Sequence, residues 1–365
     1  MPLFRLKPAP CAPDTAGMAR LKIAPLTPWI TEAAVLHGDD LPNHLVQRLD
    51  ISRRRAGSLL RKLAQAQWLA VAGTPRRPTY RPGALRQVVR RYPLQGLQED
   101  LPWRCDFHPF FELPAEVRRM AQHAFTELLN NAIDHSGGAN VTVSMRQTPL
   151  QLQLLVSDDG CGVFERIAQS FDIGDPQLAM LELCKGKLTS LPERHSGHGL
   201  FFTSRLADVF DIHANAAAFQ CRSWDGRRWH AARPAARTGT SVYLAINIDS
   251  PRTLDGVLRE HSQDGTSYGF ERTVVPLQLV AADGVGLISR ADAKRVACNL
   301  TRFQRADIDF DGVTEIGHGF ADELFRVFQC QHPQLAIVPV AMQPRVAAMV
   351  RQVIGSAVGL QAAAG

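Results

Sequence analysis

One stretch of the sequence, residues 121–138 (AQHAFTELLNNAIDHSGG), constrains the fold more than any other. Its apolar residues recur at the 3.6-residue spacing of a helix that packs one face against a core. Four polar side chains, His123, Glu127, Asn131 and Asp134, fall on the adjoining side. Because Glu127 and Asn131 are four residues apart, they lie on successive turns and can act on the same small volume. The stretch predicts a helix on which Glu127 takes a proton from water and Asn131 holds Mg²⁺. Taken alone, it is equally typical of an amphipathic helix with a solvated polar face.

The composition places the chain among globular proteins with more than one domain. Its 365 residues suffice for two or three cores, and 45% of them are apolar and 21% charged. The seven cysteines are scattered and form no CxxC pair, which favours a reducing compartment over a disulfide framework or a structural zinc site. No apolar run approaches the length of a membrane span. We therefore predict a cytoplasmic protein without a membrane partner.

The net charge of +6 is unevenly distributed. Residues 51–98 contain eleven Arg and Lys residues and no Asp or Glu, so the rest of the chain has a net charge of −5. Such a split is typical of one nucleic-acid-facing module attached to near-neutral or acidic domains. It predicts DNA as a partner of the N-terminal region.

The N-terminal region resembles a winged helix-turn-helix, assigned to residues 30–83. The proline-rich residues 1–29 are predicted to be a flexible leader, and residues 84–112, which contain three prolines, a connector. Ser52 is a good N-cap for the third helix. The expected helices are 29–38, 42–49 and 52–68, and the extended pieces of the wing are 69–72 and 79–81.

Six arginines are the candidate DNA contacts of this module. The third helix would enter the major groove by its N-terminal end, and the wing tip would meet phosphate or the minor groove. The residues concerned are Arg53, Arg54 and Arg55 at the helix start, Arg61 as a flank contact, and Arg76 and Arg77 at the wing tip. Two alternatives stay open: a winged helix used only for protein contacts, and an arginine-rich solvated surface.

Two strands follow the 121–138 helix and end in an acidic, glycine-rich turn. Alternating apolar residues predict antiparallel strands over 141–145 and 152–156, the second ending in Asp158-Asp159-Gly160-Cys161-Gly162. A carboxylate at a strand end can accept the exocyclic amine of adenine, and the glycines let the backbone pass close under a flat base. Further on, Thr240 opens another strand and could bond the same adenine edge.

Residues 163–198, between these motifs, are predicted to be a long irregular segment that acts as a lid. Gly197 and Gly199 precede a helical run over 201–207, and would place free backbone N–H groups at a positive helix end, where phosphates dock.

Three side chains of the lid are further candidates for phosphate contact. His198, inside the glycine loop, could bond phosphate when protonated, or could be a plain surface residue. Lys185 and Lys187 are two of only six lysines in the chain. Either could reach the γ-phosphate as a mobile cation, and simple solvation of the lid is the alternative.

The four motifs ELLNNAIDH, DDGCG, GHGL and GTSV, in this order, resemble the N, G1, G2 and terminal motifs of the GHKL ATPase superfamily. The resemblance covers about residues 113–250. It implies a Bergerat fold, an α/β sandwich with helices on one face of a mixed sheet, and it implies ATP and Mg²⁺ as cofactors. Carried over by position, it makes Glu127 the general base, Asn131 the Mg²⁺ ligand, Asp158 the adenine reader, Gly160 and Gly162 the turn under the base, Gly197 and Gly199 the phosphate loop, and Thr240 the second adenine contact. One departure is Phe201, in GHGLFF, where many relatives have a small residue.

The C-terminal region resembles a STAS-like domain of unknown function, assigned to residues 273–355. A connector over 251–272 precedes it and a tail over 356–365 follows it. Alternating short strands and helices, and the run DIDFDGVTEIGHGFADELFRVF, carry the resemblance. It implies a protein partner, since STAS domains partner anti-sigma-factor kinases of the GHKL class. The serine that accepts phosphate in those partners is replaced here by Gly317-His318-Gly319.

Three functions follow from these motifs. The first is a transcription regulator of the α/β class whose Mg-ATP-dependent lid closure alters DNA engagement, through the STAS-like domain or an ATP-dependent homodimer. The second is an anti-sigma-type protein serine/threonine kinase acting on a partner protein. The third is an ATP-binding scaffold without hydrolysis.

Overall fold

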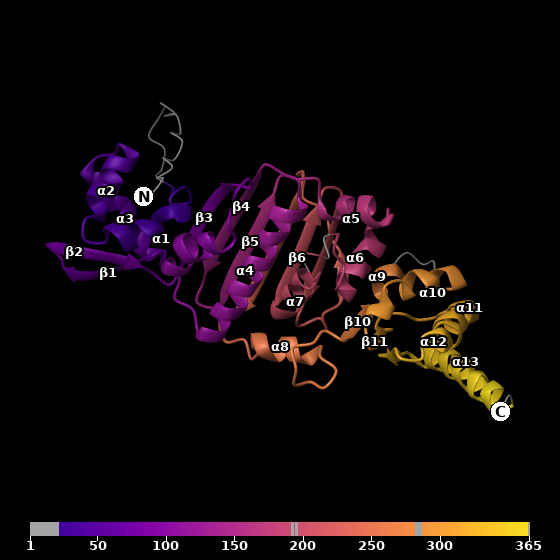
Figure 1. Cartoon of the computed structure of the whole chain (residues 1–365). Coiled ribbons are helices and arrows are strands. Elements are labelled where there is room, and N and C mark those ends of the chain that lie inside the picture. Colours follow the sequence, from indigo (N-terminus) through magenta and orange to yellow (C-terminus); the bar gives the residue numbers. More distant parts are fainter. Residues whose placement is uncertain (1–21, 191–192, 194–195, 282–286, 364–365) are drawn as a thin grey trace. The chain divides into compact units, whose positions relative to one another are not determined.

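The computed structural model describes residues 22–190, 193, 196–281 and 287–363 (Figure 1). Most of the predicted leader, residues 1–21, lies outside the described residues. The chain divides into two compact units, Met1–Gly83 and Ala84–Gly365. No described helix is both long and apolar enough to cross a membrane.

The N-terminal unit consists of three helices and a two-stranded antiparallel hairpin. The helices are α1 (Thr27–His37), α2 (Leu41–Leu49) and α3 (Arg53–Gln65), and the strands are β1 (Leu69–Thr74) and β2 (Arg77–Pro82). The Ser52 side chain accepts a hydrogen bond from the Arg55 N–H and so caps α3 as predicted. Leu41, Leu59 and Leu63 are fully or almost fully buried between the helices. The predicted leader, residues 1–29, overlaps the first helix, because α1 begins at Thr27. Pro28 fits the first turn of this helix, where its missing N–H is not needed for a hydrogen bond.

The second unit is built around a seven-stranded sheet in the order β3-β4-β5-β9-β6-β7-β8. All its neighbouring strands pair antiparallel, whereas the resemblance implied a mixed sheet. The strands are β3 (Arg86–Pro93), β4 (Asn140–Gln147), β5 (Gln151–Asp158), β6 (Val209–Ala214), β7 (Ala217–Arg222), β8 (Trp229–Ala231) and β9 (Thr240–Asn247).

The segment 84–112 is not an irregular connector. Its strand β3 forms an edge of the large sheet, paired with β4 along its whole length. A π-helix, η1 (Pro102–Phe107), and a 3₁₀ turn, η2 (His108–Phe110), follow. Phe107 is fully buried and packs against Phe125, with ring centroids 5.1 Å apart. Apolar side chains between the prolines therefore pack this segment into the hydrophobic core.

Helices cover one face of the sheet (Figure 1). They are α4 (Ala115–His135), α5 (Val163–Phe171), α6 (Pro176–Lys185) and α7 (Gly199–Leu206). The prediction of an irregular segment over 163–198 was wrong, since α5 and α6 occupy most of it. Phe164 and Ile167 of α5 are buried, at a spacing that suits a helix. The segment 251–272 likewise contains a helix, α8 (Leu254–Glu260).

The C-terminal part of this unit alternates strands and helices around a three-stranded parallel sheet in the order β10-β11-β12. Its elements are β10 (Arg272–Pro276), α9 (Gln278–Ala281), α10 (Arg290–Ala297), η3 (Leu300–Arg302), β11 (Arg305–Asp309), α11 (His318–Asp322), η4 (Glu323–Phe328), α12 (Gln329–Gln331), β12 (Ala336–Val340) and α13 (Pro344–Ala363). Directly after β10 the chain turns into the short helix α9. The expected tail over 356–365 is helical as far as Ala363, and its last two residues are outside the described ones.

Candidate functional site

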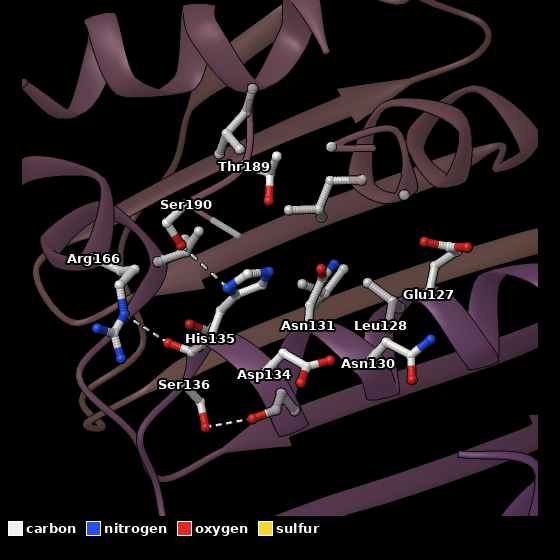
Figure 2. Close-up of a pocket in the computed structure, with 18 of the residues that line it drawn as sticks. Glu127, Leu128, Asn130, Asn131, Asp134, His135, Ser136, Arg166, Thr189 and Ser190 are labelled. Atoms are coloured by element: carbon white, nitrogen blue, oxygen red, sulfur yellow. Dashed lines mark hydrogen bonds between the residues drawn. The ribbon is translucent and has the colours of Figure 1, made fainter. Parts of the chain in front are cut away.

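A cavity of about 540 Å³ lies between α4, the strands β5 and β9, and the segment that leads into α7. Figure 2 shows Glu127 and Asn131 projecting from α4 toward the side where Thr189 and Ser190 lie. The volume falls in the range of small-molecule sites. The cavity is lined by eight of the ten residues predicted for catalysis, metal and cofactor: Glu127, Asn131, Asp158, Gly162, Gly197, His198, Gly199 and Thr240. Two, Gly160 and Lys187, do not line it.

Glu127 lies directly beneath the start of α7. A Cβ atom added to Gly199 would come within 2.2 Å of the Glu127 Oε2 atom. The absence of a side chain at Gly199 is therefore what lets the carboxylate occupy this position. The contact also joins the first predicted motif to the third across about 70 residues of sequence, which no local pattern could establish.

Asn131, one turn further along α4, has a buried amide atom without a hydrogen-bond partner among the described residues. This atom is Nδ2, which donates hydrogen bonds. A buried polar group without a partner is destabilising unless a ligand satisfies it. An acceptor oxygen of a bound ligand would satisfy this N–H donor, while the amide Oδ1 atom of Asn131 and the Glu127 carboxylate are oxygens of the kind that Mg²⁺ prefers. The described residues contain no cluster of three His, Cys, Asp or Glu side chains suited to a metal.

Asp158 lies at the end of β5 on the opposite wall of the cavity and is only 6% exposed. Its Oδ1 atom accepts hydrogen bonds from the Gly160 N–H, at 2.9 Å, and the Thr240 N–H, at 3.1 Å. Burial raises the pKa of the carboxyl group, and these two hydrogen bonds act in the opposite direction. Oδ2 accepts no hydrogen bond from the described residues, which leaves it for a donor such as an exocyclic amine.

The two glycine turns beside Asp158 are held together by Asn215, a residue that the sequence reasoning missed. Its Nδ2 atom donates to the Cys161 carbonyl, at 2.8 Å, and its Oδ1 atom accepts from the Gly239 N–H, at 3.1 Å. Gly162 has φ +93°, a conformation that favours glycine. Gly160 packs closely against the end of α4, since a Cβ atom added there would lie 2.2 Å from the carbonyl oxygen of Ser136.

The lid side of the cavity rests on the end of α4. The Ser190 hydroxyl and the His135 Nδ1 atom are 3.4 Å apart, and the Arg166 Nε–H donates to the His135 carbonyl, at 2.8 Å (Figure 2). Arg166, Thr189 and Ser190 line the cavity and were also missed. The spacing of the apolar residues in α5 was the available signal for Arg166, since it predicts a helix that begins just after Gly162.

Lys187 is directed away from the cavity, which contradicts its predicted phosphate contact. Its ammonium group donates to the Arg302 carbonyl, at 2.8 Å, and lies 4.5 Å from the centroid of the Phe303 ring. In return, the Arg302 guanidinium donates to the Lys187 carbonyl, at 2.7 Å. The other lysine of the lid, Lys185, is completely buried against Glu182.

His198 lines the cavity but does not suit a protonated phosphate contact. Burial, and secondarily the charge of Lys187, lower its pKa to about 4, so the ring is neutral near pH 7. The ring lies 4.7 Å from that of Phe270, in a T-shaped arrangement. Phe201 belongs to the same aromatic cluster, with its ring centroid 4.5 Å from that of Phe270. The large side chain that stands where many relatives have a small residue is therefore buried in the core.

In the N-terminal unit, a groove between α3 and the β1-β2 hairpin brings together Arg53, Arg76 and Arg77. The Arg53 Nη2 group donates to the Asn43 Oδ1 atom, at 2.9 Å. Asp39 and Asp40 also line this groove. The remaining predicted contacts, Arg54, Arg55 and Arg61, are exposed and lie outside the groove lining.

Comparison with protein families agrees with this geometry. Residues 116–249 match the family model of histidine kinase-, DNA gyrase B-, and HSP90-like ATPases. Residues 292–344 match a STAS-like domain of unknown function. A search of curated proteins found no match. The chain therefore contains a GHKL-type ATPase domain and a STAS-like domain within an α/β architecture, which confirms these parts of the prediction and supports ATP binding with a regulatory or kinase-like role.

Proposed function

We propose that this chain is an Mg-ATP-dependent regulator that hydrolyses ATP and transmits the state of its nucleotide site to the STAS-like domain and to DNA. The observation that carries the proposal is the meeting of Glu127, Asn131 and Asp158 in one cavity. These residues come from two separate motifs and supply a base, an oxygen ligand and a purine-reading carboxylate.

Asp158 is the proposed adenine contact. Its Oδ1 atom is fixed by two backbone N–H groups, so Oδ2 has a defined direction. A carboxylate that accepts the 6-amino group of adenine discriminates against a purine with a carbonyl oxygen at that position, such as guanine, because two acceptor atoms would then face each other. We expect adenine to be preferred over guanine for this reason.

Glu127 is the proposed general base. Its carboxylate lies against Gly199 at the N-terminus of α7, the end at which phosphate groups are favoured. A base there is positioned to take a proton from a water molecule next to a terminal phosphate. Asn131 would hold Mg²⁺, which when bound neutralises charge on the phosphate oxygens.

The contact between the lid and the STAS-like domain supports a coupling of nucleotide state to this domain. Lys185, at the end of α6, donates to the Cys298 carbonyl, at 2.9 Å, and its own carbonyl accepts from the Thr273 hydroxyl, at 2.7 Å. Glu182 accepts from the Asn299 amide, at 2.9 Å. A nucleotide that binds one lid position more tightly than another would therefore shift the set of contacts on the STAS-like side.

DNA is the proposed partner of the N-terminal unit, read as a winged helix-turn-helix. The exposed Arg53, Arg54 and Arg55 occupy the first turn of α3, the end that enters a major groove in this class of module. Arg76 and Arg77 at the hairpin tip supply the cationic flank.

Incubation with γ-labelled ATP tests the proposed chemistry. The proposal predicts that labelled phosphate is released by the wild-type chain, and that Glu127→Gln lowers release about 100-fold or more, the usual contribution of a general base. ATP binding should persist in this variant, because the amide keeps the shape of the side chain. Label on a protein would identify a kinase instead, and binding without release would identify a scaffold.

A further inference from the structure

A second cavity, of about 450 Å³, lies at the C-terminal end of α7, between α7, α8 and the strand β10 of the STAS-like part, whereas the nucleotide site uses the N-terminal end of this helix. We propose that this cavity binds a small organic anion that carries a phosphate group. The proposal is independent of nucleotide binding, since it rests on other residues.

Two guanidinium groups in this cavity lack a carboxylate partner among the described residues. Arg205 makes only long contacts, 3.4 Å to the Phe201 carbonyl and 3.5 Å to the Ser204 hydroxyl, and stacks on the Phe201 ring at 3.5 Å. Arg227 donates to the Ser204 carbonyl, at 3.2 Å. Arg252, the third arginine, is paired with Asp208 at 2.5 Å. Arg205 and Arg227 therefore have no carboxylate in direct contact among the described residues.

Burial makes the charged forms of Arg205 and Arg227 less favourable. Burial lowers the pKa of Arg205 to about 10, and the charge of Arg227 contributes to the shift. Burial also lowers the pKa of Arg227. Glu260 and Asp309 line the cavity, but among the described residues neither forms an ion pair with either guanidinium; the charge of Glu260 acts on both from a distance and partly opposes the lowering of their pKa values. An anion between the two guanidiniums would offset the cost of keeping them charged.

The shape and charge of the cavity select the class of ligand. Guanidinium groups bind phosphate through paired N–H groups, and two of them match a doubly charged phosphate. The wall beyond the arginines is apolar and consists of Trp229, Val257, Val274 and Pro276. A phosphorylated molecule with an apolar or planar body therefore fits better than inorganic phosphate alone.

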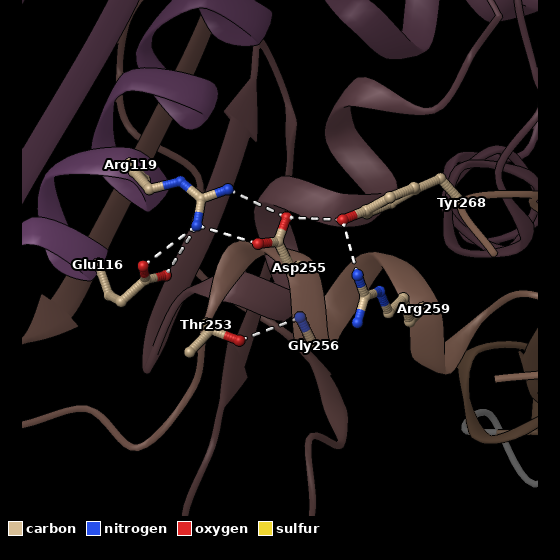
Figure 3. A network of polar contacts seen from close by, with 7 residues as sticks. All are labelled: Glu116, Arg119, Thr253, Asp255, Gly256, Arg259 and Tyr268. Carbon is tan, nitrogen blue, oxygen red and sulfur yellow. Dashed lines mark hydrogen bonds and ion pairs between the residues drawn. The ribbon is translucent and has the colours of Figure 1, made fainter. Parts of the chain in front are cut away.

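The wall formed by α8 is fastened from outside, so the cavity is already shaped. Arg119 of α4 forms an ion pair with Asp255 at 3.0 Å and a second one with Glu116 at 3.1 Å (Figure 3). Tyr268 donates to Asp255 and accepts from Arg259. The Thr253 side chain caps α8 by accepting from the Gly256 N–H, at 3.0 Å. Of these contacts, the Arg119–Asp255 ion pair joins α8 to α4 through two residues that do not line the cavity.

Isothermal titration calorimetry with phenyl phosphate as the probe tests the proposal, using the full chain at fixed ionic strength and without Mg²⁺. Phenyl phosphate should bind the wild type at one site. Arg227→Gln should weaken this binding about tenfold or more, the usual effect of losing a hydrogen bond to a charged group. Arg233→Gln, an exposed arginine outside the cavity, is the matched control and should bind like the wild type.

Asp158→Ala separates the two cavities, because it alters the nucleotide site alone and should leave phenyl phosphate binding unchanged. Binding that is lost in Asp158→Ala, or that is equal in Arg227→Gln and the wild type, would overturn the proposal, as would the absence of binding at millimolar probe. Should Arg227→Gln lose its fold by circular dichroism, Arg227→Lys keeps the charge without the paired donors and should still weaken binding.

Discussion

At the scale of single residues, the nucleotide site depends on the close approach of Gly199 to Glu127. A methyl group at Gly199 would overlap the Glu127 carboxylate and move it. We predict that Gly199→Ala lowers ATP hydrolysis at least about tenfold, since catalysis by a positioned base is sensitive to its placement. Gly174→Ala is the control, because a Cβ there would meet nothing within 4 Å. Equal hydrolysis in both variants would show that Glu127 does not act from this position.

His261, buried behind α7, predicts a pH dependence of stability. Burial, and secondarily the charge of Arg205, lower its pKa to about 3 from the ordinary value of 6.5. Below pH 6.5 the His261 ring therefore binds a proton in the unfolded chain but stays neutral in the folded chain. The free energy of unfolding consequently falls as pH drops from 6.5 toward 3. At about pH 5 the loss is about 2 kcal/mol relative to pH 7. Urea unfolding at both pH values should show this difference shrink in His261→Gln. An unchanged difference would contradict the assignment.

Sequence alone could predict that residues of separate local motifs meet in one cavity. Glu127, Asn131 and Asp158 all line the predicted cavity, because helix periodicity and a strand-end turn fix where their side chains point. Lys187 and His198 were misjudged because the residues that they touch, Arg302 and Phe270, lie far away in the sequence. Asn215 was missed for the same reason, since it bridges two turns that only the sheet brings together.

At the scale of elements, the junction between α6 and the STAS-like part contains a buried ion pair. Lys185 is fully buried and its partner Glu182 nearly so. We predict that Lys185→Ala destabilises the chain by about 3–5 kcal/mol, because it leaves the Glu182 charge buried and unpaired.

The double variant Lys185→Met/Glu182→Leu should be less destabilising than Lys185→Ala, since it removes both charges and keeps the volume. Denaturant titration of the single and double variants measures the difference. A double variant that is as unstable as the single one would mean that packing, rather than the charge pair, holds α6.

Element boundaries followed the sequence where caps and periodicity were clear. Ser52 caps α3 as expected, and Ser289 caps α10 with a full capping box. The segment 163–198 was wrongly predicted to be irregular, because the prediction relied on the glycines and charged residues near its end and overlooked two helices at its start. The segment 84–112 was misread because prolines were taken as evidence against structure, although Pro93 and Pro102 stand at the ends of elements.

At the scale of the whole molecule, the concentration of arginine in one unit predicts a salt-dependent affinity for DNA. The triple variant Arg53→Ala/Arg54→Ala/Arg55→Ala should weaken binding and reduce the slope of log affinity against log salt by up to about 3, one for each arginine that no longer neutralises a phosphate. Gel shifts over a salt series measure this slope. The exposed Arg118, outside this unit, gives the control Arg118→Ala, and equal slopes in all proteins would remove DNA as a partner of these arginines.

The order of the parts along the chain could be predicted, because charge, motif order and strand-helix alternation differ from one part to the next. The sequence did not predict that the lid would pack on the STAS-like domain. That junction depends on contacts such as the reciprocal hydrogen bonds of Lys187 and Arg302, between residues that share no local pattern.

The central claim is that Glu127, Asn131 and Asp158 form one Mg-ATP site. Calorimetric titration of Mg-ATP into the full chain, compared with Asp158→Ala, tests it most directly. The account predicts saturable binding by the wild type at one site per chain and a loss of at least about tenfold in affinity in Asp158→Ala, which has no carboxylate to accept the adenine amine. Equal affinities, or no heat of binding to a wild-type chain that is folded, would contradict it.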